Sequence, residues 1–171
     1  TFRISLVYSD REHRVRLFWS AHENHHSSVS YTFGTAVRMP WAVVLYHPVI
    51  GLWAPFFGFP PEMLATMEAF NLVCGLLQHT ELVGKLGPLE WVFATPSHHR
   101  VHHGSDTPYL DCNYGARFIV WDRMFGTFVE ETFRPTYGLV KNLNTHNPLR
   151  IVFHGAASLL RDMAKAGSLR N

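Results

Sequence analysis

Cysteine is scarce in this chain. Its 171 residues include only Cys74 and Cys112, which lie far apart and form no CxxC pair. A disulfide framework or a thiolate zinc site needs more cysteines at closer spacing. We therefore expect neither kind of site, and we expect both cysteines to be buried apolar residues.

An excess of positive charge is also missing. The chain has 15 Lys and Arg against 13 Asp and Glu, a formal net charge of +2. Nucleic-acid binders carry a dense basic surface, so no nucleic acid is expected as a partner. The first ten residues lack the basic start and apolar core of a signal peptide, and no initiating Met is present. We expect a single domain over residues 1–171, truncated at its N-terminus.

Charge is absent altogether from Trp41 to Phe59. At helical rise this run would span roughly 28 Å, close to the thickness of a hydrocarbon core. Pro48 and Pro55 favour a kinked span or a re-entrant piece over one straight helix. A second apolar stretch over 63–77 carries only Glu68 as a charge, so 41–79 is predicted to form a membrane hairpin. A buried helical pair in a soluble protein is the alternative, because the mean hydropathy of −0.03 suits either class.

The polar parts of the chain lie on either side of this hairpin. Residues 1–38 and 95–150 hold most of the histidines and charges and are expected to face water. The segment 132–148 is rich in Asn, Thr, Pro and Gly and predicts a loop. From Gly155 onward, apolar and basic residues alternate as in a helix that lies on lipid headgroups, and a solvated tail helix fits equally well.

Histidine is the residue in excess, with 12 copies that are mostly clustered. Two segments share the pattern HxxHH, whose positions project onto one face of a helix. Random placement would give about 0.06 such triplets in a chain of this composition. The triplets consist of His22, His25 and His26, and of His99, His102 and His103.

Two such faces predict a metal site. Burying six imidazoles is costly unless something shares their lone pairs, and a metal ion does so. Imidazole suits Fe, Zn, Cu or Ni, so the ligand type leaves the metal open. Two triplets exceed the three or four ligands of a single zinc, which favours two metals. We expect the triplets to face each other, with His22, His26, His99 and His103 near a shared pair of metals.

The other histidines differ in their surroundings. His98 points about 100° away from His99 on a helix, so we expect it to support a ligand rather than bind metal. His47 lies in the apolar run and is assigned to the membrane interface. His146 and His154 lie in the loop and the tail and are secondary candidates. His13 and His79 stay open at this point.

Six short motifs occur in a fixed order along the chain. They are HxxHHSS at 22–28, HTE at 79–81, GPLE at 87–90, TPSHHRVHH at 95–103, NYG at 113–115 and WDRMFGT at 121–127. In order and spacing they resemble the fatty acid hydroxylase and sterol desaturase superfamily, especially its alkylglycerol monooxygenase branch, and the resemblance covers about 12–153.

The resemblance implies an all-α integral membrane protein whose histidine-rich cap faces the cytosol and holds two iron ions. Zinc could replace iron in isolated protein. Asn113 and Asp122 would support the ligands, together with His98. The ligands implied by the resemblance are His13, His22, His25, His26, His79, His99, His102 and His103.

One position departs from the family pattern. The HxxxH element would place a histidine four residues before His13, where this chain has Ser9, followed by Asp10. A hydroxyl is a poor iron ligand. Either fewer histidines, with water or Asp10, complete the metal centre, or the chain is a catalytically impaired relative of the oxygenases.

The expected reaction is hydroxylation or desaturation of a lipid with O2, because breaking an unactivated C–H bond needs a metal that reduces O2. The substrate would be a fatty acid, a sterol or an ether lipid. No Rossmann glycine pattern and no haem-attachment motif occurs in the chain. Electrons must therefore come from a separate reductase, a cytochrome or a reduced pterin.

A zinc hydrolase is the competing interpretation. Residues 22–26 also match HExxH, in which Glu23 would activate water. The match is short, since no third ligand follows at a suitable spacing and the second triplet has Arg100 in place of a glutamate. We therefore expect Glu23 to face solvent or to support a ligand.

Overall fold

The structure is a computed structural model that describes residues 10–43 and 51–166. These residues form helices joined by long loops, with two isolated bridges, Phe93 to Phe118 and Gly104 to Tyr137, and no strand within the described ranges. The prediction of an all-α fold is confirmed. The α-helices are α2 (Arg16–His26), α3 (Phe33–Ala36), α5 (Pro61–Gln78), α6 (Pro96–His102), α7 (Val120–Phe125) and α8 (Pro148–Lys165), and the 3-10 helices are η1 (Ala54–Phe57), η2 (Gly87–Trp91) and η3 (Thr107–Tyr109).

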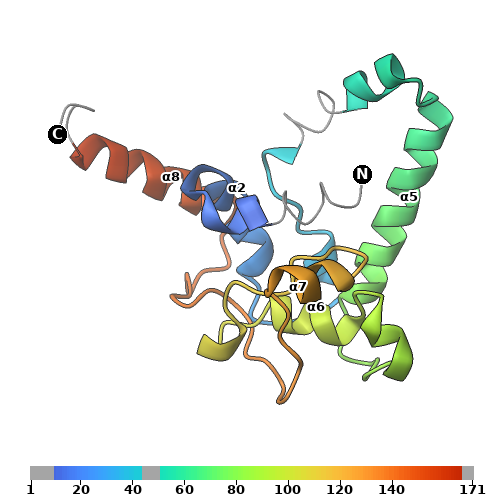
Figure 1. Ribbon diagram of the computed structural model, residues 1–171. Helices are drawn as coiled ribbons and strands as arrows, with labels where there is room; N and C mark the ends of the chain where they lie inside the picture. Colours follow the sequence, from blue (N-terminus) through green and yellow to red (C-terminus); the bar gives the residue numbers. More distant parts are fainter. Residues whose placement is uncertain (1–9, 44–50, 167–171) are drawn as a thin grey trace.

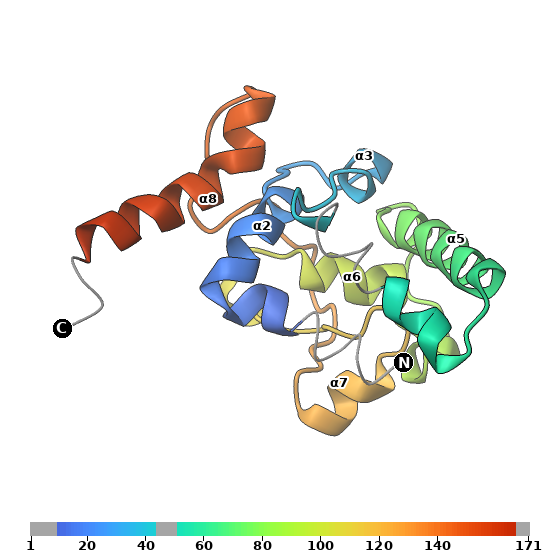
Figure 2. The same ribbon diagram turned by 90° about the horizontal axis from the view of Figure 1, so that it is seen from above.

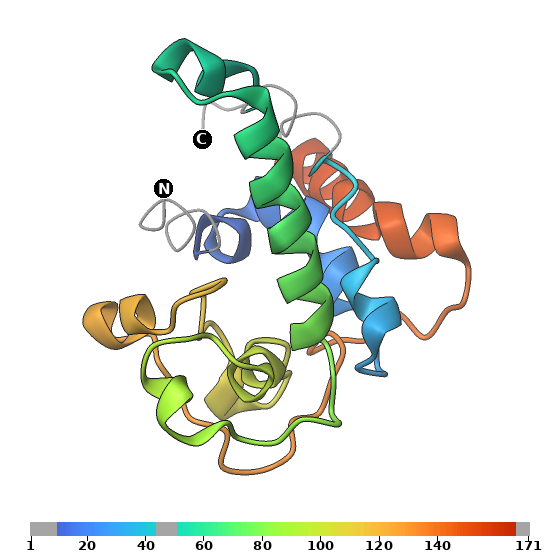
Figure 3. The same ribbon diagram turned by 90° about the vertical axis from the view of Figure 1, so that its right-hand side faces the viewer.

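The helices form two arms above a compact base (Figure 1). Seen from above, α2 lies between α8 and α6 (Figure 2). The C-terminal end of α5 reaches α6, as the side view shows (Figure 3). This arrangement brings the C-terminal ends of α2 and α5 to α6, and each of these ends carries histidines.

Helix α6 begins at a strong local signal. Thr95 is its N-cap, and Pro96 occupies the first turn, where a missing N–H costs nothing. The Thr95 hydroxyl faces the N3 backbone while the His98 Nδ1 accepts from the Thr95 N–H at 3.3 Å, which forms a capping box. The second histidine triplet therefore starts from a fixed helix terminus.

Helix α8 begins seven residues before the predicted start at Gly155. Asn147 is its N-cap, and the Asn147 Oδ1 accepts from the backbone N–H groups of Leu149 and Arg150 at 3.0 and 3.2 Å. Pro148 follows at the first helical position. The Asn-Pro pair was counted as loop sequence, whereas here it is the start signal of a helix. The predicted loop before it is confirmed.

Helices α2 and α8 approach closely at Gly155. A Cβ on this glycine would lie 1.7 Å from the Glu23 Oε1 and 2.5 Å from the Ser20 carbonyl oxygen. Only a glycine fits this crossing. Arg16 adds hydrogen bonds from its guanidinium to the Ser158 hydroxyl at 3.0 Å and the Asp162 carboxylate at 3.1 Å.

The interior of the base is more polar than apolar. The apolar cluster is small and consists of Val101, Tyr109 and Cys112, with Val129 packed against it. The other buried residues are mostly histidines and hydrogen-bonded polar side chains. Cys112 is buried as expected, whereas Cys74 is only half-buried, and both are free thiols. The base is thus packed around a polar site rather than around a hydrophobic core.

Many exposed apolar side chains lie on the arm that contains α5. Helix α5 and the residues before it expose large side chains such as Trp53, Phe56 and Phe70. The predicted second apolar stretch, 63–77, lies entirely within α5. The first stretch, 41–59, is only partly described, because residues 44–50 and with them His47 lie outside the described ranges. Among the described helices, none combines the length and the apolar character needed to cross a membrane.

Candidate metal centre

Eight histidines meet in the base of the molecule, and they are the eight that the resemblance implied as ligands. They form two groups of four, and within each group the potential ligand nitrogens lie within 4.8 Å of one another. The His13 group consists of His13, His22, His26 and His102, and the His79 group consists of His25, His79, His99 and His103.

Each HxxHH triplet is divided between the two groups. Helix α2 sends His22 and His26 to the His13 group and His25 to the His79 group. The triplet that begins in α6 sends one side chain to the first group and two to the second. The triplets face each other, as predicted, and the His26 and His103 rings stack with centroids 4.2 Å apart. The two groups are therefore in direct contact through these imidazole rings.

Two more segments complete the groups. His79 follows α5 directly as its C-cap, and His13 lies on a helical turn over residues 10–14, just before α2. Ser9, the position of the expected additional histidine, lies outside the described residues. Both groups have four histidines without it.

The spacing of the nitrogens suits metal ligation. The Nε2 atom of His26 is 3.0 Å from that of His13 and 3.1 Å from that of His22. In the other group, the His79 Nε2 lies 3.2 to 3.3 Å from the Nε2 atoms of the other three histidines. Two ligands bound at about 2.0–2.1 Å with angles of 90–110° would be separated by roughly 2.9–3.4 Å. The observed separations fall in this interval.

Backbone carbonyls orient three of the rings. The Nδ1 atoms of His25, His79 and His102 lie 3.1, 2.6 and 3.0 Å from the carbonyl oxygens of Arg38, Gly75 and Cys112, respectively. An Nδ1–H that donates to a carbonyl leaves Nε2 with a free lone pair on the opposite side of the ring. These three rings thus present Nε2 to the centre of their groups.

Burial favours the neutral form of six of these imidazoles. It lowers the pKa of His25 and of His102 to about 3, and neighbouring histidines add to the effect. Burial likewise lowers the pKa values of His22, His26, His99 and His103 well below the usual value, again helped by adjacent rings. A neutral imidazole is the form that binds a metal.

The residues expected to support the ligands act one step away from them. The Asn113 amide donates to the His98 and Val129 carbonyl oxygens, at 3.2 and 2.8 Å. The Asp122 carboxylate accepts from the backbone N–H groups of Tyr114 and Gly115, both at 2.7 Å. These bonds anchor the segment that begins at Cys112, whose carbonyl faces His102. Their effect on the ligands is indirect.

His98 faces away from both groups. Its Nδ1 belongs to the α6 capping box, and its Nε2 lies 4.0 Å from the Glu90 carboxylate. Glu90 also accepts from the Ser97 hydroxyl at 2.7 Å. His98 therefore stabilises the start of the helix that carries the second triplet.

Glu23 also faces away from the metal groups, but not toward solvent as one expectation held. It is buried between α2 and α8, and its Oε2 lies 3.2 Å from the His154 Nε2. A zinc hydrolase needs this glutamate beside a metal-bound water. The HExxH interpretation is therefore wrong, and His154 has a structural partner. His146 lies on the surface, outside both groups.

The family model for fatty acid hydroxylases matches residues 10–127, which include all eight histidines of the two groups. The chain belongs to the fatty acid hydroxylase family. The resemblance noted in the sequence is thereby confirmed, and the site lies within the matched region.

Curated relatives agree with this family membership. The chain is 44% identical to an alkylglycerol monooxygenase of Xenopus tropicalis over 81% of its own length and 31% of the relative's. It is 40% identical to the human alkylglycerol monooxygenase over 86% of its length and 33% of the relative's. An ornithine lipid hydroxylase of Rhizobium tropici is 29% identical, over 68% and 35% of the two chains. The chain thus spans about a third of the length of these relatives. No solved structure matches it.

Two cavities lie near the histidine groups of this family member. One, of about 280 Å³, is lined by His13, His26, His102 and His103, together with Trp19 and a mixture of polar and apolar loop residues. The other, of about 590 Å³, is an apolar groove between α5 and the segments 82–96 and 117–118. Gln78 and Thr80, which flank His79 in the chain, line this second groove. The smaller cavity thus reaches ligands of both groups, whereas the apolar groove is lined by the neighbours of His79 and by no histidine of the groups.

Some neighbours of the site were missed in the sequence. The Tyr31 ring stacks on His79 with centroids 5.4 Å apart, and Tyr137 stacks on Tyr31 at 4.8 Å. Arg100 forms a bidentate pair with Glu131 at 2.6 and 2.7 Å and donates to the Thr80 and Val83 carbonyls. Because these contacts join distant segments, no local pattern signals them.

Proposed function

We propose that this chain forms the catalytic part of a membrane-bound, non-haem di-iron oxygenase that hydroxylates or desaturates a lipid with O2. The observation that carries the proposal is the pair of histidine groups. Each group offers four buried or half-buried imidazoles at ligand separations, and the stacked His26 and His103 rings join the groups. All eight histidines are proposed as ligands.

The donor set fits iron. Eight imidazoles in two groups suit two metal ions, and imidazole nitrogen is a common iron ligand. When bound, the irons would supply the O2 reduction needed to break an unactivated C–H bond. Zinc could occupy the same nitrogens in isolated protein.

The chain's own residues would then orient and enclose the centre. The carbonyls of Arg38, Gly75 and Cys112 hold three rings in place, and Tyr31 covers His79. The apolar groove along α5 would hold a hydrocarbon chain and exclude water beside His79. A C–H bond near the His79 group would thus be presented in dry surroundings.

Membrane attachment is part of the proposal. The exposed apolar side chains of α5 and of the segment before it favour a lipid-facing wall. The polar base would face the cytosol, where a reductase, a cytochrome or a reduced pterin would deliver electrons. Because two relatives are named for alkylglycerols, an ether lipid is the proposed substrate.

A catalytically impaired relative is the second candidate, and Ser9 is the observation that favours it. A histidine at this position would be expected to strengthen the nearer metal site. If Ser9→His raises bound iron towards two per chain and increases lipid oxidation, the natural chain is impaired. The comparison includes His13→Ala. If neither change alters metal content, residues 9 and 13 are not part of the site.

The direct test is expression of the full-length protein in membranes, followed by iron and zinc analysis and lipid profiling under ¹⁸O2. We expect two metals per chain and label in the lipid product, or an O2-dependent new double bond. His103→Ala should lose both metal and activity, whereas the surface variant His146→Ala should keep both. Equal metal content in the two variants would contradict the assignment.

A further inference from the structure

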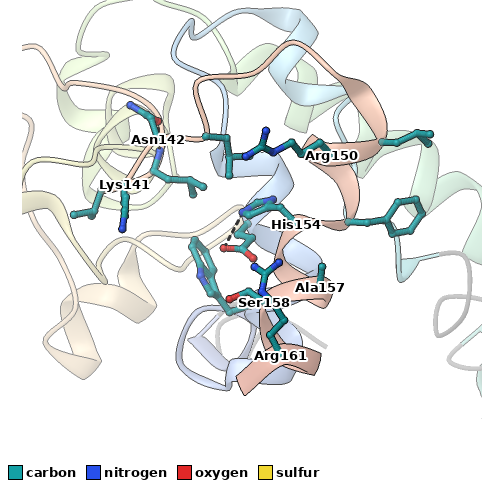
Figure 4. Close-up of a pocket in the computed structure, with 14 residues that line it drawn as sticks. Lys141, Asn142, Arg150, His154, Ala157, Ser158 and Arg161 are labelled. Atoms are coloured by element: carbon teal, nitrogen blue, oxygen red, sulfur yellow. Dashed lines mark hydrogen bonds and ion pairs between the residues drawn. The ribbon is translucent and has the colours of Figure 1, made fainter. Parts of the chain in front are cut away.

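A large pocket lies outside the metal centre, between α2, α8 and the loop over 139–143. Its volume is about 770 Å³. Figure 4 shows Arg150 and Arg161 on α8 with His154 between them, and Lys141 on the facing loop. All three cations line the pocket, whereas Glu23 is its only acidic lining residue.

The three cations have no carboxylate to neutralise them. No ion pair within the described ranges involves Lys141, Arg150 or Arg161, whereas Arg16 on the neighbouring helix pairs with Asp162 at 3.1 Å. Glu23 is held by His154 inside the helix crossing. The pocket therefore keeps an excess of positive charge that suits an anion, and guanidinium groups match phosphate oxygens in geometry.

The edge of the pocket is apolar and exposed. Leu149 and Phe153 line it and are both open to solvent. With Leu160 and Met163 they recur at spacings of three, four and seven residues, which places them on one face of α8. All four are at least 47% exposed. A stripe of this kind beside cations is typical of helices that lie at a membrane surface.

We propose that this pocket binds the phosphate headgroup of a phospholipid, with the lipid's apolar chain along the exposed face of α8. The cations would bind the phosphate, and Leu149 and Phe153 would contact the first carbons of the chain. A free anion would contact only the cations, and a neutral lipid would contact only the apolar side chains.

The pocket also lies next to the metal centre. Trp19, Leu139 and Val140 line both this pocket and the smaller cavity beside the His13 group. The Trp19 ring lies 5.4 Å from the His13 ring, centroid to centroid. A phospholipid held here would sit beside the centre without contacting its ligands. The inference goes beyond the proposed oxygenase activity and does not depend on it.

The test is calorimetric titration of the full-length protein, in a neutral detergent, with dihexanoylphosphatidate. The variant Arg150→Gln/Arg161→Gln removes two cations from the pocket. The matched control, Lys85→Gln/Lys165→Gln, removes two exposed cations outside it. At about 1 kcal/mol for each cation, the pocket variant should bind roughly thirtyfold more weakly. The control should stay within twofold of the natural protein. An equal loss in both variants would indicate diffuse attraction and overturn the proposal.

Two further ligands separate the sources of binding. Inorganic phosphate should bind the natural protein much more weakly than the lipid, and Leu149→Asn should weaken the lipid roughly tenfold while leaving phosphate unchanged. If phosphate or neutral dihexanoylglycerol binds as tightly as phosphatidate, the lipid assignment is wrong. Metal content is measured in the same samples. A protein that binds phosphatidate but no metal would refute the proposed oxygenase and leave this site standing.

Discussion

The two histidine groups contain the same number of ligands but differ in how firmly they are held. In the His79 group, His25 and His79 face backbone carbonyls through Nδ1, and Tyr31 covers one ring. In the His13 group, His102 faces a backbone carbonyl in the same way, and His13 comes from a short turn that lines a cavity. A site held by packed helices is more preorganised than one closed by a short turn. We therefore expect the His79 group to bind its metal more tightly.

The largest expected effect comes from removing one ligand of each group. His79→Ala should weaken the tighter metal by more than about a hundredfold, above the effect of losing an outer partner. His13→Ala should release only the weaker metal and leave about one per chain. Competition with a chelator, followed by metal analysis, measures both affinities. Loss of the same metal in both variants would mean that the groups are not separate sites.

The helix crossing that positions three ligands gives the next effect. Gly155→Ala would push a methyl group against Glu23 and the Ser20 carbonyl, which should cost about 1–3 kcal/mol of unfolding free energy. Because α2 carries histidines of both groups, both metal affinities should fall together. Denaturant titration and metal analysis test this. The control is Ala157→Ser on the exposed side of α8, which should change neither.

Acidification should lower the stability of the metal-free protein through the buried histidines of both groups. Their pKa values are lowered in the folded chain, to about 3 for His25 and His102. Above about pH 6.5 the histidines of the unfolded chain are also mostly neutral, so these groups cost the folded chain no stability there. As the pH falls below this value, the unfolded chain binds protons that the folded chain does not, and stability decreases. Unfolding of the metal-free protein from pH 7.5 to 5 should show this decline. A flat profile would contradict the buried, neutral state.

The smallest effect concerns Glu12, whose carboxylate lies 3.5 Å from the His22 Nδ1. A carboxylate near the outer nitrogen of a ligand raises its basicity. Glu12→Gln should therefore weaken metal binding at the His13 group by up to about tenfold, at the low end for such partners. Binding at the His79 group should not change. Chelator competition distinguishes the two, and Glu130→Gln on the surface is the matched control.

Local sequence patterns were enough to predict the histidine-bearing helix faces, the family and one long helix. The i, i+3, i+4 spacing put three imidazoles on one face of each of two helices, and the order of the motifs indicated the family. Helix α5 was also predictable, because its apolar run is too long and too apolar to be a loop. Such features depend on neighbours within one or two turns, which a sequence displays directly.

Tertiary structure alone decided how the ligands were divided. The split of each triplet between two groups depends on the angle at which α2 meets α6, and the carbonyls that orient the rings belong to residues as distant as Arg38 and Cys112. Glu23 was expected to face solvent or to support a ligand, but the close approach at Gly155 buries it against His154. These outcomes depend on contacts between segments far apart in the chain, whose geometry is set by packing and carries no local sequence pattern.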